Sequence, residues 1–344
     1  MPEGKNRRWL FEKRPDGPVG PQNFRWTESV IPSPGEGQFL ARNLWLSFDP
    51  TQVLGLVAPP SEGGYQVGEP MGTFAVSQVV ESHIPKFQRG DLVYGASYWE
   101  DYSVVDGKGY WDTAKVLPGA SPRLAAGMLG ITGMVAYFGV VEVGRPRPGE
   151  TFLVSAAAGG VGSIAVQVAK LLGARVIGIA GGKEKCEWLV GEAHADAAID
   201  HRREDVATRL DALCPKGIDV YFDNVGGPTL DLALERLRPH GRVVLCGTTA
   251  RYRAEPPLPG PQNYWRLIMV NGRMEGLLGR DYFDRFPEAM TVLKGWLDAG
   301  KIRSKEDVVE GLEHAPETLA RLYSGANVGK QLLKVADPAP MDPP

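Results

Sequence analysis

The pattern of hydrophobic and polar positions changes character near residue 125. Before that point, short alternating or β-branched runs such as residues 72–80 and 90–94 are separated by turns rich in proline and glycine. Alternation with a period of two is typical of strands that bury one face. The pattern therefore predicts a β-rich module over residues 1–124.

From about residue 125 to residue 300, apolar runs alternate with segments of helical period. The expected strands cover residues 151–156, 174–180, 217–222 and 241–246, and a helix is expected over residues 286–299. Strands that alternate with helices form a parallel sheet covered on both faces. We therefore expect an α/β fold with a doubly wound parallel sheet.

The end of the chain returns to short β-like pieces over residues 308–335, which we expect to rejoin the first module. The predicted domains are thus residues 1–124 completed by 308–336, and residues 125–307. Residues 337–344 contain four prolines and are expected to form a flexible tail.

The strand at residues 151–156 runs into a glycine-rich turn that opens a helix. Ala157, Gly159 and Gly162 occupy the turn, and an apolar helical pattern follows at once. A glycine allows the close backbone approach of a pyrophosphate, and a helix N-terminus favours its negative charge. This strand, turn and helix predict a dinucleotide-binding unit.

The end of the next strand indicates which dinucleotide binds. An NAD site usually has an acidic residue there, whereas this chain has Gly181 and Gly182 followed by Lys183, Glu184 and Lys185. The glycines leave room for a 2′-phosphate, and the lysines supply positive charge. We therefore expect NADP(H), although both lysines could also be solvated residues of the next helix.

Composition excludes several other classes of function. The net charge of −3 disfavours binding to nucleic acid or to an anionic membrane surface. Three widely spaced cysteines do not form a disulfide framework, and the N-terminal residues are polar, so a cytoplasmic protein is expected. The first 124 residues contain no cysteine and one histidine, His83, so no zinc site is expected.

Taken in order, a series of motifs resembles the medium-chain dehydrogenase/reductase superfamily. More narrowly, the chain resembles its zinc-free leukotriene B4 dehydrogenase, prostaglandin reductase and alkenal double-bond reductase group, which includes bacterial curcumin reductases. The matching motifs are residues 6–8, 43–50, 130–133, 136–139, 219–227, 241–247, 259–264, 273–276 and 327–330. The resemblance implies a GroES-like β-rich domain beside a Rossmann domain, and a homodimer.

The resemblance also implies a set of cofactor contacts. Lys185 matches a lysine that pairs with the 2′-phosphate, and His201 stands where the family usually has a tyrosine, although a solvated loop histidine is an equal alternative. Cys246 matches a cysteine beside the nicotinamide and is not expected to act as a nucleophile. The expected cofactor-binding residues are Ala157, Gly159, Gly160, Val161, Gly162, Gly181, Lys185, His201, Asn224, Cys246, Tyr252 and Asn327.

The substrate pocket implied by the resemblance departs from the family pattern. The usual Asp-Pro-Tyr-Met-Arg segment reads Asp-Pro-Thr-Gln-Val here, so Thr51 replaces a phenol and an arginine is lost. Val135 replaces a common threonine, and Met269 stands where plant relatives have a proposed proton-donating tyrosine. Tyr264 is the tentative catalytic residue and a pocket residue. Other open candidates for an aromatic side chain at the pocket are Tyr98, Trp99 and Tyr102.

We therefore expect an NADPH-dependent enzyme that transfers hydride to the β-carbon of α,β-unsaturated aldehydes or ketones. The carbonyl group already activates the alkene, so such chemistry needs mainly positioning and hydrogen-bond donors. The alternatives are an NADPH:quinone oxidoreductase, a protein that binds NADPH without turnover, and a reductase for one biosynthetic intermediate.

Overall fold

The computed structural model describes residues 4–107, 112–252 and 258–340, and the chain forms two compact units. The first unit combines Met1–Gly130 with Glu306–Pro344, and the second is Ile131–Lys305. The domain boundaries predicted from the sequence stay a prediction. Of the predicted tail, residues 341–344 lie outside the described residues, whereas Ala339 N donates a hydrogen bond to Gln78 Oε1 at 2.8 Å.

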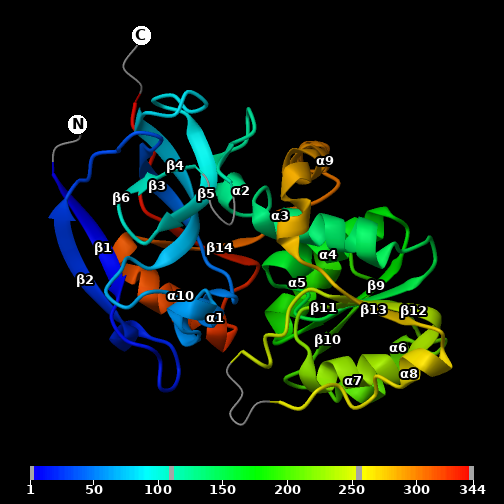
Figure 1. Ribbon diagram of the computed structural model, residues 1–344. Helices are drawn as coiled ribbons and strands as arrows, with labels where there is room; N and C mark the ends of the chain where they lie inside the picture. The colour runs from blue at the N-terminus through cyan, green and yellow to red at the C-terminus, as the bar shows by residue number, and fades with distance from the viewer. Residues whose placement is uncertain (1–3, 108–111, 253–257, 341–344) are drawn as a thin grey trace. The chain divides into compact units, whose positions relative to one another are not determined.

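The first unit is built on β-sheets, as the alternating pattern predicts (Figure 1). Its strands are β1 (Lys5–Phe11), β2 (Phe24–Val30), β3 (Phe39–Ser47), β4 (Gly72–Ser82), β5 (Leu92–Tyr98), β6 (Tyr102–Val105), β7 (Ala114–Lys115), β14 (Glu306–Glu310) and β15 (Lys330–Lys334). The larger sheet runs in the order β14-β15-β3-β4-β5-β7, with β6 paired to β3, while β1 and β2 form a separate hairpin. The last strands thus complete a sheet that the first residues begin.

The helices of the first unit are short, with one exception. They are η1 (Pro21–Asn23), α1 (Gln52–Val57), η2 (Pro60–Glu62), α2 (Pro122–Ala126), η5 (Leu312–His314) and α10 (Ala315–Ser324). Helix α10 corrects the expectation that residues 308–335 form only short β-like pieces. Pro316 lies in its first turn, Leu319 is buried, and Gly325 ends it in the left-handed conformation.

A buried polar network holds the strands of the first unit together. The Asn43 amide donates to Tyr98 O, Glu100 O and Ser103 Oγ, and its oxygen accepts from the hydroxyls of Ser77 and Ser97. Each buried donor or acceptor that is paired avoids a desolvation cost of about 1–3 kcal/mol. The network explains why polar side chains occupy the interior of this sheet.

The second unit contains a six-stranded sheet in the order β10-β9-β8-β11-β12-β13, and every neighbouring pair is parallel. Its strands are β8 (Thr151–Val154), β9 (Arg175–Ala180), β10 (Ala197–Asp200), β11 (Ile218–Asp223), β12 (Leu237–Leu245) and β13 (Arg273–Gly276). In sequence order this is the 3-2-1-4-5-6 arrangement of a Rossmann sheet. The predicted doubly wound fold is confirmed.

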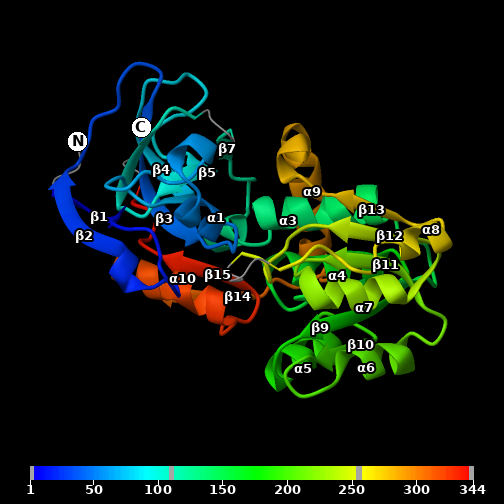
Figure 2. The same ribbon diagram turned by 60° about the horizontal axis from the view of Figure 1, so that its bottom comes forward.

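Helices cover both faces of this sheet (Figures 1 and 2). They are α3 (Ile131–Phe138), the π-helical turn η3 (Gly139–Gly144), α4 (Gly160–Leu171), α5 (Lys183–Gly191), α6 (Val206–Leu213), α7 (Gly227–Glu235), α8 (Arg266–Met269), η4 (Gly279–Arg285) and α9 (Phe286–Asp298). Leu210 of α6 and Leu234 of α7 pack with Ile177 and Tyr221 of the sheet in one apolar cluster. Leu189 of α5 lies against Gly178 of β9.

Glu100 gives the first unit a pH-dependent stability. Burial raises the pKa of its carboxyl group from 4.5 to about 7, and hydrogen bonds from Ser103 and Asn6 oppose that rise only in part. The folded protein therefore binds this proton more tightly than the unfolded chain does. Consequently, the contribution of Glu100 to the free energy of unfolding falls as the pH rises from about 4.5 to about 7.

We expect Glu100→Gln to remove this pH-dependent loss, because glutamine keeps an oxygen for Asn6 and carries no titrating charge. Urea unfolding of both proteins across this pH range measures the difference. The advantage of the variant should grow with pH up to about 7 and then level off. A difference that does not change with pH would contradict the assignment.

Candidate functional site

The turn between β8 and α4 leaves a helix N-terminus without a side-chain cap. Strand β8 ends at Val154, α4 begins at Gly160, and no described side chain accepts a hydrogen bond at its N-cap, Gly159. The N–H groups of the first helical turn have no acceptor within the helix. Together with the helix dipole they form a site suited to an anionic phosphate.

The close packing of this turn depends on Gly162. A Cβ atom at Gly162 would lie 2.3 Å from Ala156 O and 2.8 Å from Ala157 Cα, both backbone atoms. Ala157 is buried, and its N–H donates to Ile179 O of β9 at 2.9 Å. The helix therefore starts directly against the strand ends, and the turn exposes bare backbone.

A second group of predicted residues gathers where β9 ends. A Cβ atom at Gly181 would lie 2.7 Å from His201 Nε2 and 2.9 Å from Arg202 Nε. On α5, Lys183 forms an exposed ion pair with Glu187 at 3.5 Å, whereas Lys185 is partly buried. The structure thus brings Gly181 and His201 together, and it adds Arg202, which sequence reasoning missed.

Asp200, at the end of β10, was also missed. Its Oδ1 accepts from the N–H of Gly182 at 2.7 Å and of Arg202 at 3.1 Å, and its carboxylate lies 3.9 Å from Arg203 Nε. Hydrogen bonding from Gly182 is the main cause that lowers the pKa of Asp200. Its Oδ1 thus fixes the loop that carries Gly181, whereas its buried Oδ2 has no hydrogen-bond partner among the described residues.

Asn224 lies where β11 ends, beside β8. Its Nδ2 donates to Ser155 O at 2.7 Å, and its backbone N–H donates to Ser155 Oγ at 2.9 Å. The buried Asp223 stabilises the same turn, because its Oδ1 accepts from Tyr221 Oη and from the N–H groups of Val225 and Gly226. Its Oδ2 is buried without a partner among the described residues. Nothing in the sequence pattern distinguished Asp223 from a turn residue.

Cys246 and Tyr252 follow β12 at the same edge of the sheet. The Cys246 N–H donates to Asp223 O at 2.9 Å. Burial, with a smaller contribution from the charge of Asp223, raises the pKa of the Cys246 thiol to about 12. The thiol is therefore protonated at neutral pH, which does not suit a nucleophile. The Tyr252 hydroxyl lies 3.5 Å from Thr248 N.

Four other residues were predicted to bind the cofactor or the substrate, and three of them lie in the first unit and one in the second. In the first unit, the buried Asn327 donates from Nδ2 to Gly329 O at 2.8 Å, Thr51 is the exposed N-cap of α1, and Tyr98 ends β5 with a half-exposed ring. In the second unit, Val135 lies half-buried in α3.

Tyr264 and Met269, which the resemblance assigns to the substrate pocket, lie at α8, and that assignment stays a prediction. They flank and end α8, which lies beside the early part of β12, since His240 N donates to Val270 O at 2.7 Å. The glycine-rich turn between β8 and α4 lies at the carboxyl ends of the strands. The two side chains are 61% and 67% exposed.

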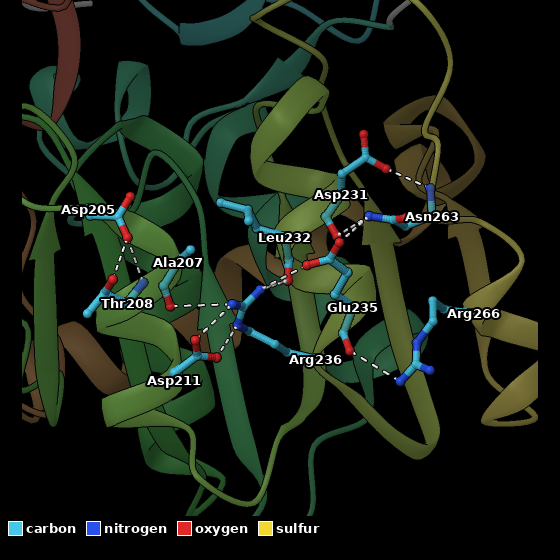
Figure 3. Close-up of polar contacts among 10 residues, drawn as sticks. All are labelled: Asp205, Ala207, Thr208, Asp211, Asp231, Leu232, Glu235, Arg236, Asn263 and Arg266. Atoms are coloured by element: carbon cyan, nitrogen blue, oxygen red, sulfur yellow. Dashed lines mark hydrogen bonds and ion pairs between the residues drawn. The ribbon is translucent and has the colours of Figure 1, made fainter.

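Contacts with α7 explain this position (Figure 3). Asn263 N donates to Asp231 Oδ1 at 2.8 Å, and Arg266 Nη2 donates to Glu235 O at 3.3 Å. At the end of the same helix, Arg236 Nε binds Asp211 Oδ1 of α6 at 2.7 Å. Polar contacts thus hold the segment before α8 along the outside of the sheet.

In residues 4–107, 112–252 and 258–340, no group of three or more His, Cys, Asp or Glu side chains could hold a metal ion. No helix in this part of the chain combines the length and apolar character required to cross a membrane.

Comparison with protein families gives two matches. The model described as the N-terminal domain of oxidoreductase matches residues 7–113, and the model described as zinc-binding dehydrogenase matches residues 160–295. An NADPH-dependent curcumin reductase of Escherichia coli is 39% identical over 96% of this chain and 97% of that protein. A 2-alkenal reductase (NADP(+)-dependent) of Nicotiana tabacum is 39% identical over 88% of each chain.

Solved structures agree with this result. CurA from Vibrio vulnificus in complex with NADPH has a TM-score of 0.88 and 35% identity, and the match covers 96% of this chain and 100% of that one. Escherichia coli quinone oxidoreductase complexed with NADPH has a TM-score of 0.79 and 25% identity, over 95% of this chain and 99% of that one.

The role of Gly162 can be tested by Gly162→Ala. Because the new methyl group would meet backbone atoms that cannot rotate away, we expect the free energy of unfolding to fall by about 1–3 kcal/mol. Gly295→Ala in α9 is the matched control, since its Cβ would meet nothing within 4 Å. That control should gain about 0.5–1 kcal/mol from helix propensity. Equal urea midpoints for the two variants would contradict the argument.

Proposed function

The chain belongs to the zinc-free medium-chain dehydrogenase/reductase family, in its group of curcumin, alkenal and prostaglandin reductases, and on that premise we propose its reaction. It is an NADP-dependent oxidoreductase that reduces the activated carbon–carbon double bond of α,β-unsaturated aldehydes and ketones. The observation that carries this proposal is the N-terminus of α4, which has no side-chain cap. It lies on the same edge of the sheet as the basic residues Lys185, His201 and Arg202, which follow β9 and β10.

The residues of the second unit fit the cofactor at both of its phosphate groups. We assign the diphosphate to the N–H groups of Gly160, Val161 and Gly162, where the turn offers bare backbone. We assign the 2′-phosphate to Lys185, His201 and Arg202, and the last two have side chains packed against the backbone of Gly181.

We place the nicotinamide end near Asn224 and Cys246, at the carboxyl ends of β11 and β12. Tyr252 follows the same strand end.

When bound, NADPH supplies the hydride that adds to the β-carbon of the substrate. The chain's own residues bind and orient, because the substrate carbonyl already activates the alkene. Cys246 has to remain inert beside an electrophilic alkene, since a thiolate would add to it. A thiol whose pKa is about 12 meets that requirement.

The first unit favours an apolar substrate without a carboxylate. The segment from Asp49 to Val53 has no arginine that could pair with a substrate carboxylate. On the helix that follows, Leu54 and Val57 are 44% and 47% exposed. We propose that Thr51 and Tyr98 contact uncharged enones and enals.

We further propose that the enzyme is a cytoplasmic homodimer. Strand β13 is an edge strand of the six-stranded sheet, and in the segment that precedes it in sequence Tyr264, Trp265, Ile268 and Met269 expose apolar surface. Such a surface next to an unpaired strand edge is typical of a protein–protein contact. Analytical ultracentrifugation tests this part, and a monomer at micromolar concentration would overturn it.

Substrate panels test the proposed reaction. Purified protein should oxidise NADPH in the presence of enals and enones and yield the saturated carbonyl product. Consumption of cofactor with quinones alone would favour the quinone reductase, which shares this fold. Binding of NADPH with no oxidation across the panel would favour a binding protein.

The preference for NADPH over NADH tests the assignment of Lys185 to the 2′-phosphate. We expect Lys185→Glu to raise the KM for NADPH by about tenfold to a hundredfold, because the loss of a charge-assisted hydrogen bond costs about 1.5–3 kcal/mol. The KM for NADH should change little. Lys183→Glu is the matched control, since Lys183 forms an exposed pair with Glu187, and its effect should stay below about twofold. If Lys185→Glu weakened both cofactors equally, the assignment would be wrong.

A further inference from the structure

Tyr65 of the first unit lies in a notch formed by two glycines. A Cβ atom at Gly55 would lie 2.4–2.8 Å from three atoms of the Tyr65 ring, and one at Gly72 would lie 2.9 Å from Cε1. A side chain at either position would therefore displace the ring. Gly55 lies in α1, and Gly72 is the first residue of β4.

This notch lies between two residues already assigned to the substrate. Thr51 and Gly55 are four residues apart at the start of α1, so they share a face of that helix. Gly72 pairs with Tyr98 across β4 and β5. The Tyr65 ring thus contacts the helix face that begins with Thr51 and the strand position opposite Tyr98.

The backbone around Tyr65 is held in place. Its N–H donates to Gly55 O at 2.7 Å. Arg14 links its carbonyl to α1, because Nη2 donates to Tyr65 O at 3.3 Å and Nη1 donates to Leu56 O at 2.9 Å. A ring fixed in this way loses little further conformational entropy when it binds a ligand.

The Tyr65 hydroxyl is available as a donor. No described residue hydrogen-bonds to it, and the residue is partly exposed. Burial, with a contribution from the charge of Asp49, raises the pKa of Tyr65 to about 12. Asp49 itself pairs with Lys330 Nζ at 2.5 Å. The hydroxyl therefore keeps its proton across the physiological pH range.

We propose that Tyr65 donates a hydrogen bond to the carbonyl oxygen of the substrate and supplies, from the loop after α1, the phenol that Thr51 lacks. This inference rests on the proposed enone reduction and identifies a residue for it. The assignment makes Tyr65 a catalytic residue, because its hydroxyl touches the atom on which negative charge develops.

The reaction balances with this donor. A hydride forms the new C–H bond at the β-carbon, and the π electrons of the alkene shift so that the carbonyl oxygen carries the enolate charge. A proton from water then bonds to the α-carbon and restores the carbonyl group. Tyr65 donates throughout and is not consumed. A donor aimed at a developing oxyanion acts mainly on kcat.

The test is Tyr65→Phe, assayed with 4-phenyl-3-buten-2-one and NADPH. The variant keeps the ring in the notch and removes only the hydroxyl. We expect kcat to fall by about a hundredfold. The Kd of the enone for the complex with NADP⁺, measured by calorimetry, should rise only about fivefold, because the ground state carries less charge on oxygen. The melting temperature should not change.

Two further variants complete the design. Gly55→Ala should displace the ring and also lower kcat/KM. Tyr323→Phe is the control, since it removes a phenol of the same unit whose hydroxyl lies 3.4 Å from Pro50 O, and its kcat should stay within about twofold of the wild type.

The possible failures are distinguishable. Wild-type protein that does not reduce enones would overturn the proposed function and this inference together. Wild-type turnover with an unchanged kcat in Tyr65→Phe would overturn this inference alone.

Discussion

The close contact between the start of α4 and the end of β8 is the constraint on which the rest of the site depends. Gly162 permits a backbone approach that a single methyl group would block, and the N–H groups of that helical turn are left without side-chain caps. An uncapped helix N-terminus at the carboxyl edge of a parallel sheet favours an anion. The order of the strands places the ends of β9, β11 and β12 along the same edge, where we propose that cationic, amide and thiol groups contact the cofactor.

Much of this could be predicted from the sequence, because period and glycine spacing are local properties. The alternation of strands and helices, the turn at Gly159 and Gly162 and the basic end of β9 all follow from short segments. Helix α10 could not be predicted in that way, because it lies between β14 and β15, whose sequences have the pattern of strands. Asp200 and Arg202 were missed because their contacts with Gly182 and Gly181 join the ends of two different strands. Asp223 was missed because its hydrogen bonds with Tyr221, Val225 and Gly226 are local, as for any turn residue. Tyr264 is assigned to the pocket by resemblance alone and stays a prediction, while its neighbours Asn263 and Arg266 contact α7.

The two units divide the proposed chemistry. In the proposed function, the second unit supplies positive charge and backbone donors for the cofactor, and the first supplies an apolar, hydroxyl-bearing surface at α1 for the substrate. The thiol of Cys246 is held in its neutral form, so it does not react with an electrophilic alkene. We infer that Tyr65 takes the place of the phenol that the resemblance implies at position 51, and glycines at positions 55 and 72 make the space for its ring. Catalysis in such a site depends on positioning and on donors aimed at developing charge, with no need for an acid–base pair.

The central claim is that this edge of the sheet binds a dinucleotide with an additional phosphate. Isothermal titration calorimetry of the wild-type protein with NADP⁺ and with NAD⁺, at matched ionic strength, tests it most directly. The account predicts saturable binding of NADP⁺ at one site per chain and an affinity for NAD⁺ at least about tenfold lower, with the difference shrinking as salt is added. Equal affinities for the two, or no heat with NADP⁺, would contradict it.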